Sequence, residues 1–131
     1  QVRDNAVQAL ANICHGGDSC RSSVVAAGAV PSLTSFLQHH SSEEHADEAA
    51  HALYFLAAHS QEHRALVAAA PGGVPALVRL LRCRSETAQA QAAAAIGALC
   101  MPQGADVRAN IAAAGAIPAL VAMLLDKESP Q

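Results

Sequence analysis

The sequence predicts an all-α protein made of repeated helical units, and three observations favour that class. First, alanine supplies about a quarter of the 131 residues, whereas aromatic residues supply 2%. Side chains this small suit closely packed helices better than sheets, which favour β-branched and aromatic residues. Second, apolar residues recur at helical spacing, and third, whole segments of the chain resemble one another. With 52% apolar and 15% charged residues, the chain is expected to fold around one core.

The internal repeats are visible as three copies of one short motif. The copies are Gly28-Ala-Val-Pro31-Ser-Leu33, Gly72-Gly-Val-Pro75-Ala-Leu77 and Gly115-Ala-Ile-Pro118-Ala-Leu120, at intervals of 44 and 43 residues. Each copy is preceded by an arginine and then an aliphatic residue, and each is followed by an apolar pair. This arrangement predicts a unit of three helices, one short, one medium and one long.

The long helices are predicted at residues 2–14, 43–58 and 85–100. In each of them a small and a large apolar residue recur four apart, at a constant offset of 43: Ala6, Ala49 and Ala92, then Leu10, Leu53 and Ile96. Residues four apart share one face of a helix, and the small residue lets a neighbouring backbone approach closely. Ser41 and Glu44 form a capping-box pattern for the middle long helix, and Ser85 is placed to cap the third.

The short helices are predicted at 19–27, 61–70 and 104–114, and the medium helices at 30–38, 74–82 and 117–125. The glycine of each motif supplies the left-handed residue that ends a short helix. The proline lies in the first turn of the medium helix, where no amide donor is needed. We therefore expect a sharp turn at each Gly-x-x-Pro segment.

Together these features resemble the armadillo repeat. The resemblance is carried by a short helix ending in Ala-Ala-Gly, the segment Ala-Val-Pro-x-Leu-x-x-x-Leu, and a long helix ending Ala-Leu-Ala-Asn-Ile, and it covers nearly the whole chain. HEAT repeats are the close rival, but they are two-helix hairpins, so the Gly-x-x-Pro break favours armadillo. The resemblance implies a right-handed α-solenoid. We expect a single domain over residues 1–131, with a partial repeat at 1–16, full repeats at 17–59 and 60–102, and a partial repeat at 103–131.

Both ends of the predicted array are stacking faces. The chain begins on a long helix and finishes after a medium one, so neither end has the polar cap of a finished solenoid. We expect these faces to be covered, either by other parts of a longer parent protein or by a second copy of the chain.

In armadillo proteins the long helices line a concave groove that holds extended peptides, and the resemblance implies such a groove here. The family's asparagine position falls on Asn12, Phe55 and Ala98, and its tryptophan position on Gln8, His51 and Ala94. Asn12 alone matches, and acidic residues nearby are few, so recognition of basic peptides of the nuclear-import type is not expected. The candidate partner-binding residues are Gln8, Asn12, His51, Tyr54 and Phe55.

Two of these candidates have a structural alternative. Phe55 could anchor a partner in the groove, or it could tuck beneath a neighbouring helix. Asn12 lies near the end of its helix, where an asparagine side chain often satisfies local backbone groups.

Histidine is concentrated in one part of the chain, where six of the seven fall within 25 residues. Such a cluster raises the possibility of a metal site or a proton-dependent switch. However, His59 and His63 are separated by a predicted helix break at Ser60, and the other histidines lack a partner at helical spacing. We therefore predict no metal site and no cofactor.

Charge and cysteine usage bound the partners and the compartment. The net charge of −3 gives no reason to expect nucleic acid, and no apolar run of about 20 residues predicts a membrane span. The four cysteines lack CxxC spacing, which fits a reducing compartment such as the cytoplasm or nucleus. Cys14 aligns with Ala57 and Cys100 at a position predicted to be small and buried in every repeat.

The predicted function is that of a non-catalytic module for protein–protein interaction, a rigid scaffold that binds a partner protein or an extended peptide. The sequence shows no nucleophile–base pair, carboxylate pair or phosphate-binding loop, so we do not expect an enzyme. The alternative is a self-associating structural fragment whose open ends stack into homo-oligomers.

Overall fold

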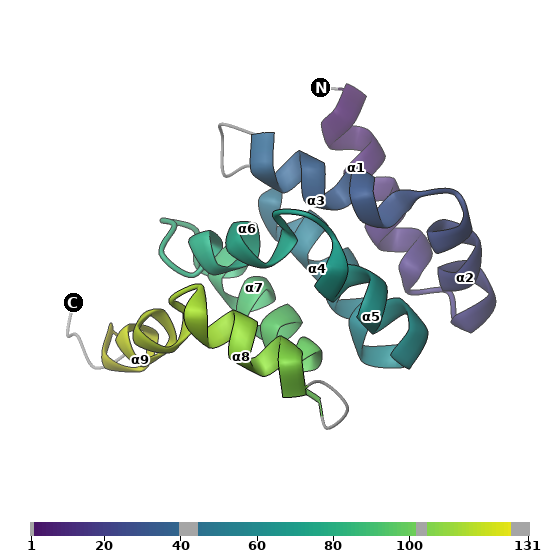
Figure 1. Ribbon diagram of the computed structural model, residues 1–131. Helices are drawn as coiled ribbons and strands as arrows, with labels where there is room; N and C mark the ends of the chain where they lie inside the picture. Colours follow the sequence, from purple (N-terminus) through teal and green to yellow (C-terminus); the bar gives the residue numbers. More distant parts are fainter. Residues whose placement is uncertain (1, 40–44, 102–104, 127–131) are drawn as a thin grey trace.

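The computed structural model describes residues 2–39, 45–101 and 105–126, and these ranges form α-helices and short connections without a strand (Figure 1). The helices are α1 (Val2–Cys14), α2 (Asp18–Ala26), α3 (Ala29–His39), α4 (Ala46–His59), α5 (Gln61–Ala69), α6 (Gly73–Leu80), α7 (Glu86–Leu99), α8 (Ala105–Ala113) and α9 (Ala116–Asp126). The all-α prediction and the order long, short, medium are thereby confirmed.

The helix boundaries agree with the sequence prediction to within a few residues, and the largest difference is at α4. This helix begins at Ala46 rather than near residue 43, because His45 adopts a left-handed conformation with φ of 67°. Ser41 and Glu44, the predicted capping box, lie outside the described residues. The other predicted cap is confirmed, since the Ser85 hydroxyl accepts a hydrogen bond from the Ala88 amide at 3.1 Å.

The Gly-x-x-Pro segments make the turns that the sequence predicts. Gly28, Gly72 and Gly115 have φ of 90°, 72° and 94°, a region that residues with a Cβ atom rarely occupy. In each case the medium helix starts at the next residue and has the motif's proline in its first turn. These turns reverse the chain so that each medium helix packs back onto its own repeat.

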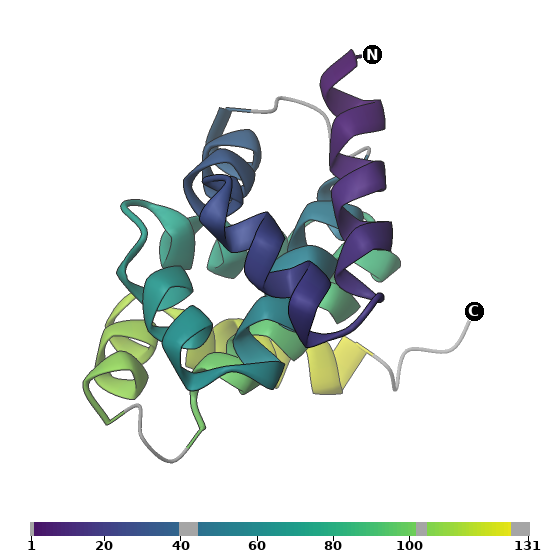
Figure 2. The same cartoon turned by 90° about the vertical axis from the view of Figure 1, so that its right-hand side faces the viewer.

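The long helices α1, α4 and α7 pack side by side, with α4 between the other two. We call this arrangement the long-helix layer. The medium helices α3 and α6 pack against each other and against the long helices that follow them. Figure 2 shows α1 at one end of the array and α8 and α9 at the other. Each helix from α2 to α8 therefore contacts its own repeat and a neighbouring one, as in a solenoid.

The core lies between the layers and is made of small and aliphatic side chains. Ala49 and Ala92 are fully buried, which lets the long helices approach closely, and Leu53, Leu56, Leu77 and Leu99 fill the space beside them. Burying one such leucine contributes about 1.5–3 kcal/mol. The apolar stripe read from the sequence is thus the packing face of each long helix.

Arginine at the start of the short helices closes the end of the preceding long helix. The Arg21 guanidinium donates to the Cys14 carbonyl oxygen at 2.8 Å, and Arg64 donates to the Ala57 carbonyl oxygen at the same distance. Cys14 and Ala57 occupy equivalent repeat positions, so the recurring arginine satisfies carbonyls that a helix terminus leaves without a partner. This explains why an arginine precedes the glycine motif.

The cysteine position aligned across the repeats is buried in two copies out of three. Cys14 and Ala57 are fully buried, as predicted, but Cys100 is half-buried, so the prediction is wrong for the third copy. Cys100 is the C-cap residue that directly follows α7, the last long helix among the described residues. Burial raises the pKa of both thiols above the ordinary cysteine value.

No single helix among the described residues is both long and apolar enough to cross a membrane. Two consecutive segments, Asp106–Ala113 and Ala116–Leu125, are together long and apolar enough, judged by length and composition alone. The chain bends by 69° between them.

Candidate functional site

The long-helix layer places equivalent positions of its three helices in rows. One row contains Gln8, His51 and Ala94, and the next contains Asn12, Phe55 and Ala98. Because α4 lies between α1 and α7, the residues of α4 are at the centre of this surface. The predicted partner-binding residues come from α1 and α4, the first two helices of the layer.

The structure divides the five predicted residues into two groups. Gln8 and Asn12 on α1 are exposed, whereas His51, Tyr54 and Phe55 on α4 are half-buried. The three α4 residues contact one another through their rings, with 4.5 Å between the centroids of His51 and Phe55 and 5.5 Å between those of Tyr54 and Phe55.

Phe55 is the centre of an aromatic cluster that extends beyond α4. The His15 ring, just after the end of α1, meets Phe55 edge-on with 4.4 Å between centroids. The His59 ring lies on its other side at 5.8 Å. Phe55 is thus held between neighbouring rings while part of its surface remains open to solvent. It is neither fully open in the groove nor buried beneath a neighbouring helix, the two alternatives drawn from the sequence.

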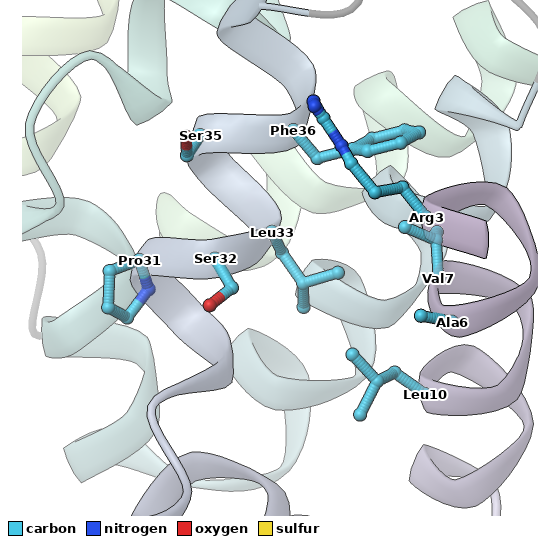
Figure 3. A pocket seen from close by; sticks show the side chains of 9 residues that line it. All are labelled: Arg3, Ala6, Val7, Leu10, Pro31, Ser32, Leu33, Ser35 and Phe36. Carbon is cyan, nitrogen blue, oxygen red and sulfur yellow. The ribbon is translucent and has the colours of Figure 1, made fainter. Parts of the chain in front are cut away.

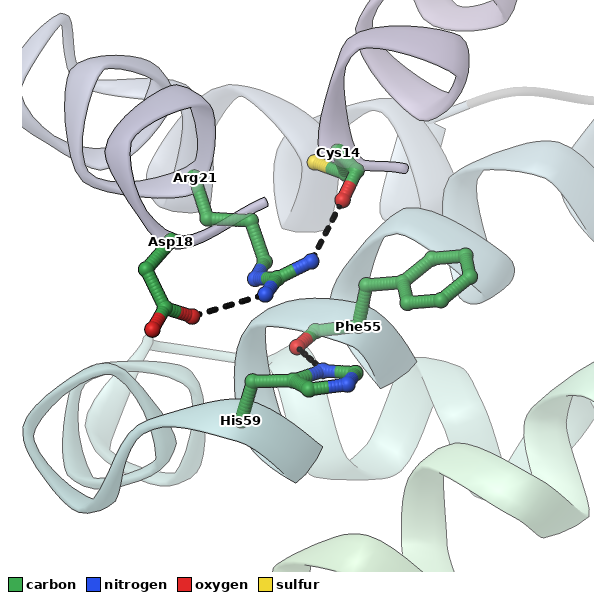
Figure 4. Close-up of polar contacts among 5 residues, drawn as sticks. All are labelled: Cys14, Asp18, Arg21, Phe55 and His59. Atoms are coloured by element: carbon green, nitrogen blue, oxygen red, sulfur yellow. Dashed lines mark hydrogen bonds and ion pairs between the residues drawn. The ribbon is translucent and has the colours of Figure 1, made fainter. Parts of the chain in front are cut away.

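Two hydrogen bonds fix the histidines around Phe55. His51 Nδ1 lies 2.6 Å from the side-chain oxygen of Gln91 on α7. His59 Nδ1 lies 3.0 Å from the Phe55 carbonyl oxygen, as Figure 4 shows. Because a backbone carbonyl oxygen can only accept, Nδ1 of His59 is the donor in its contact. The hydrogen bonds and ring contacts together restrict the rotamers of the cluster before any partner binds.

His15 and Gln91 belong to this site although the sequence analysis did not select them. Neither lies at a family motif position, and each reaches the site from a different long helix than Phe55. The only sequence signal for His15 is its place directly after the α1 residues that line the row. Finding Gln91 required knowing the packing angle between α4 and α7.

The surface is not uniform along the layer. At the α7 end the equivalent positions are Ala94 and Ala98, which add no side chain long enough to reach outward. Its acidic residues, Asp4, Asp47 and Glu48, lie in the first turns of α1 and α4, where carboxylates complement the helix dipole. The ring-bearing part of the surface is therefore confined to α1 and α4.

Apart from this surface, a polar pocket lies on the short-helix side, between the start of α2 and the start of α5. It has a volume of about 260 Å³ and a polar lining that includes Asp18, Arg21, His59 and His63. Arg21 donates to the Asp18 carboxylate at 2.7 Å. This contact holds the pKa of Asp18 below its usual value, first through the hydrogen bond and then through the arginine charge.

The histidine-rich region does not gather into a metal centre in the part of the chain that the structure describes. There, no group of three His, Cys, Asp or Glu side chains could hold a metal ion. His59 and His63 lie on different helices, on either side of Ser60. His51 and His59 instead contact Phe55, and His45 contacts Glu48 at 2.9 Å.

Comparison with known proteins now gives the family. The model of the armadillo/beta-catenin-like repeat matches residues 60–101. A designed armadillo repeat protein is 31% identical to the chain and superimposes with a TM-score of 0.82, over 96% of this chain and 51% of the design. The chain has the armadillo-repeat fold, and its residues 60–101 match the armadillo repeat itself. These matches favour armadillo over HEAT as the description of the repeat, and the solenoid architecture expected from the motifs is confirmed.

Other similar structures are also designed armadillo proteins. One, from a set computationally designed for modular peptide recognition, is 34% identical with a TM-score of 0.81, over 91% of this chain and 49% of the design. Another, in complex with the peptide (KR)4, is 29% identical with a TM-score of 0.78, over 92% and 49%. This armadillo chain therefore spans about half the length of these structures. No curated protein matches it in sequence.

Proposed function

We propose that this chain is a non-catalytic armadillo module that binds an extended segment of a partner protein across α1 and α4. The observation that carries the proposal is the half-exposed ring cluster centred on Phe55, next to the exposed side chains of Gln8 and Asn12. Aromatic residues that are partly open and well supported are typical anchors of interfaces.

Each residue has a role that follows from its chemistry. The Asn12 amide both donates and accepts, so it can pair with the backbone of an extended peptide. Phe55 offers an apolar surface for one side chain of that peptide. Because Gln91 and His15 already hold the cluster in place, binding loses little side-chain entropy there.

The sequence of this surface points to a particular class of peptide. It contains no tryptophan, and its few carboxylates lie at the helix starts rather than along the rows. We therefore propose a peptide with an apolar or aromatic anchor residue and little net charge. The designed relatives support a peptide as the class of ligand, although one of them is in complex with the basic peptide (KR)4.

The test is a peptide library screened against the purified chain, followed by affinity measurements by calorimetry. We expect selected peptides to share one apolar or aromatic position, and to lose at least about tenfold in affinity with Asn12→Ala or Phe55→Ala. The peptide (KR)4 should bind no better than a scrambled neutral peptide. Leu66→Ala on α5 is the control, because it removes an exposed apolar side chain away from the long-helix layer.

Circular dichroism melting separates binding from folding in this experiment. Asn12 is exposed, so its variant should melt as the wild type does, whereas Phe55→Ala should melt at a somewhat lower temperature. If the selected peptides bind a chain that carries both Asn12→Ala and Phe55→Ala as tightly as the wild type, the surface over α1 and α4 is not the binding site and the proposal is wrong.

A further inference from the structure

The last medium helix exposes an apolar face that its counterparts bury. Ile117, Val121 and Leu124 of α9 are 58%, 48% and 71% exposed, and we call them the α9 triad. The equivalent residues of the earlier repeats are all buried: Val30, Thr34 and Leu37, then Val74, Val78 and Leu81. The same positions are thus apolar in α9 as in α6, but lack the cover that α6 has.

The earlier repeats show what kind of element covers these positions. α3 packs against α4 and α6, and α6 packs against α7. Thr34 illustrates the contact, because its methyl group lies where a Cβ atom at Gly73, the first residue of α6, would be 3.0 Å away. α3 is therefore covered by the long helix that follows it and by the next medium helix.

The first helix, α1, also exposes a face that is buried in the later long helices. Ala6 and Ile13 of α1 are exposed and Leu10 is half-buried; together they form the α1 face. Their equivalents are buried in both later long helices: Ala49, Leu53 and Leu56, then Ala92, Ile96 and Leu99. In those helices this face lies in the core, and α4 and α7 each pack against the medium helix that precedes them in the chain.

A groove runs between α1 and α3 at this end of the molecule (Figure 3). Its volume is about 470 Å³, and its lining includes Leu10, Leu33 and Phe36. Arg3 is its one charged lining residue. The α9 segment Ala116–Leu125 carries no charged residue at all, so the groove and the helix match in polarity as well as in repeat position.

We propose that a second copy of this chain covers the α9 triad, by docking its α1 and α3 onto α9 as α4 and α6 dock onto α3. The triad then enters the groove beside Leu10 and Phe36, and α1 of the second copy becomes the long helix that follows α9. This contact joins two different faces and does not close on itself, so it produces open head-to-tail chains. It uses the α1 face and the α9 triad rather than Gln8, Asn12 and the rings around Phe55, so peptide binding relies on different residues of α1.

The test is the molar mass in solution as a function of concentration, measured by sedimentation velocity on the 131-residue chain. We expect the mean mass to rise from 13.4 kDa to more than twice that value between a few and several hundred micromolar. Ala6→Glu and Leu124→Glu each place a charge on one of the two faces, at an exposed residue, and each should keep the chain monomeric. Leu66→Glu is the matched control, because its repeat position is exposed in all three copies, and it should associate as the wild type does.

Mixing the two end variants gives the decisive result. The Ala6→Glu chain keeps its α9 triad and the Leu124→Glu chain keeps its α1 face, so the mixture should form a 1:1 dimer that grows no further. If the wild type stays monomeric at every concentration, the proposal is wrong. The α9 triad would then be a surface for another armadillo unit. An Ala6→Glu variant that still dimerises alone would overturn it too, because this result indicates symmetric α9–α9 pairing.

Discussion

The second and third medium helices, α6 and α9, are built from the same residue pattern but differ in what that pattern buries. Val74, Val78 and Leu81 lie inside the molecule, whereas Ile117, Val121 and Leu124 face solvent. Both helices follow a left-handed glycine and have a proline in their first turn. The comparison shows that each armadillo unit carries apolar positions that fit a neighbouring unit. Those positions are buried only where that neighbour is present.

The largest expected difference between the two helices concerns their equivalent leucines. Leu81→Ala removes a buried side chain and should lower the free energy of unfolding by about 2–5 kcal/mol. Leu124→Ala removes an exposed one and should change it by no more than about 0.5 kcal/mol. Urea unfolding of dilute protein, followed by circular dichroism, measures both. Similar losses for the two variants would mean that α9 is covered within the single chain.

The next comparison concerns the arginines that close the long helices. Arg21→Met leaves the buried Cys14 carbonyl oxygen without its donor and should lower the free energy of unfolding by about 1–3 kcal/mol. Arg64→Met breaks the equivalent bond to Ala57, and because Arg64 is more exposed, the loss should be smaller. The same urea titrations apply, with Asp18→Asn as the control, since it keeps the Cys14 bond. A loss from Asp18→Asn as large as that from Arg21→Met would contradict the capping role.

A smaller difference is expected between two turn glycines. Alanine in a left-handed conformation costs about 1–2 kcal/mol, and this cost applies to Gly72→Ala and Gly115→Ala alike. At Gly72, however, the new Cβ atom would lie within 2.9 Å of three Gln38 side-chain atoms, whereas nothing lies within 4 Å at Gly115. Gln38 donates to the Pro71 carbonyl oxygen at 2.6 Å, so Gly72→Ala should cost about 1 kcal/mol more.

Thermal unfolding of both alanine variants, with and without Gln38→Ala, isolates that extra cost. In the Gln38→Ala background the two glycine substitutions should become equally destabilising. A difference that persists without Gln38 would place its origin elsewhere in the α5–α6 turn.

The sequence predicted those features of the fold that depend on local chemistry. Gly28 and Ser85 define a turn and a cap by residue type alone, and the structure confirms both. His45 was missed because its left-handed conformation, which delays the start of α4, has no such signature.

The candidate site was only partly predictable for a related reason. The repeat register located Phe55 and His51 on the long-helix layer, but not their partners. His15 and Gln91 reach the cluster from α1 and α7, so their roles depend on how three helices pack together. The recurring arginine is similar, because the pattern was visible in the sequence whereas its carbonyl partner was not.

The smallest expected effect is a pH dependence of stability that the first full repeat has and the second lacks. Asp18 begins α2, and the equivalent residue of α5 is Gln61, which does not titrate. Because Arg21 lowers the pKa of Asp18 in the folded protein, the ionised contact stabilises the fold above the ordinary aspartate range. That contribution is lost as the pH falls from about 4 through the lowered pKa. A carboxyl ¹³C NMR titration should show the Asp18 pKa rising toward its ordinary value in Arg21→Met, with the smaller lowering by the His59 and His63 charges remaining. Since Asp18 is fully exposed, added salt should move it the same way in the wild type. An Asp18 pKa that does not respond to Arg21→Met would show that other charges near α2 set it, and the arginine would then act through the Cys14 carbonyl alone.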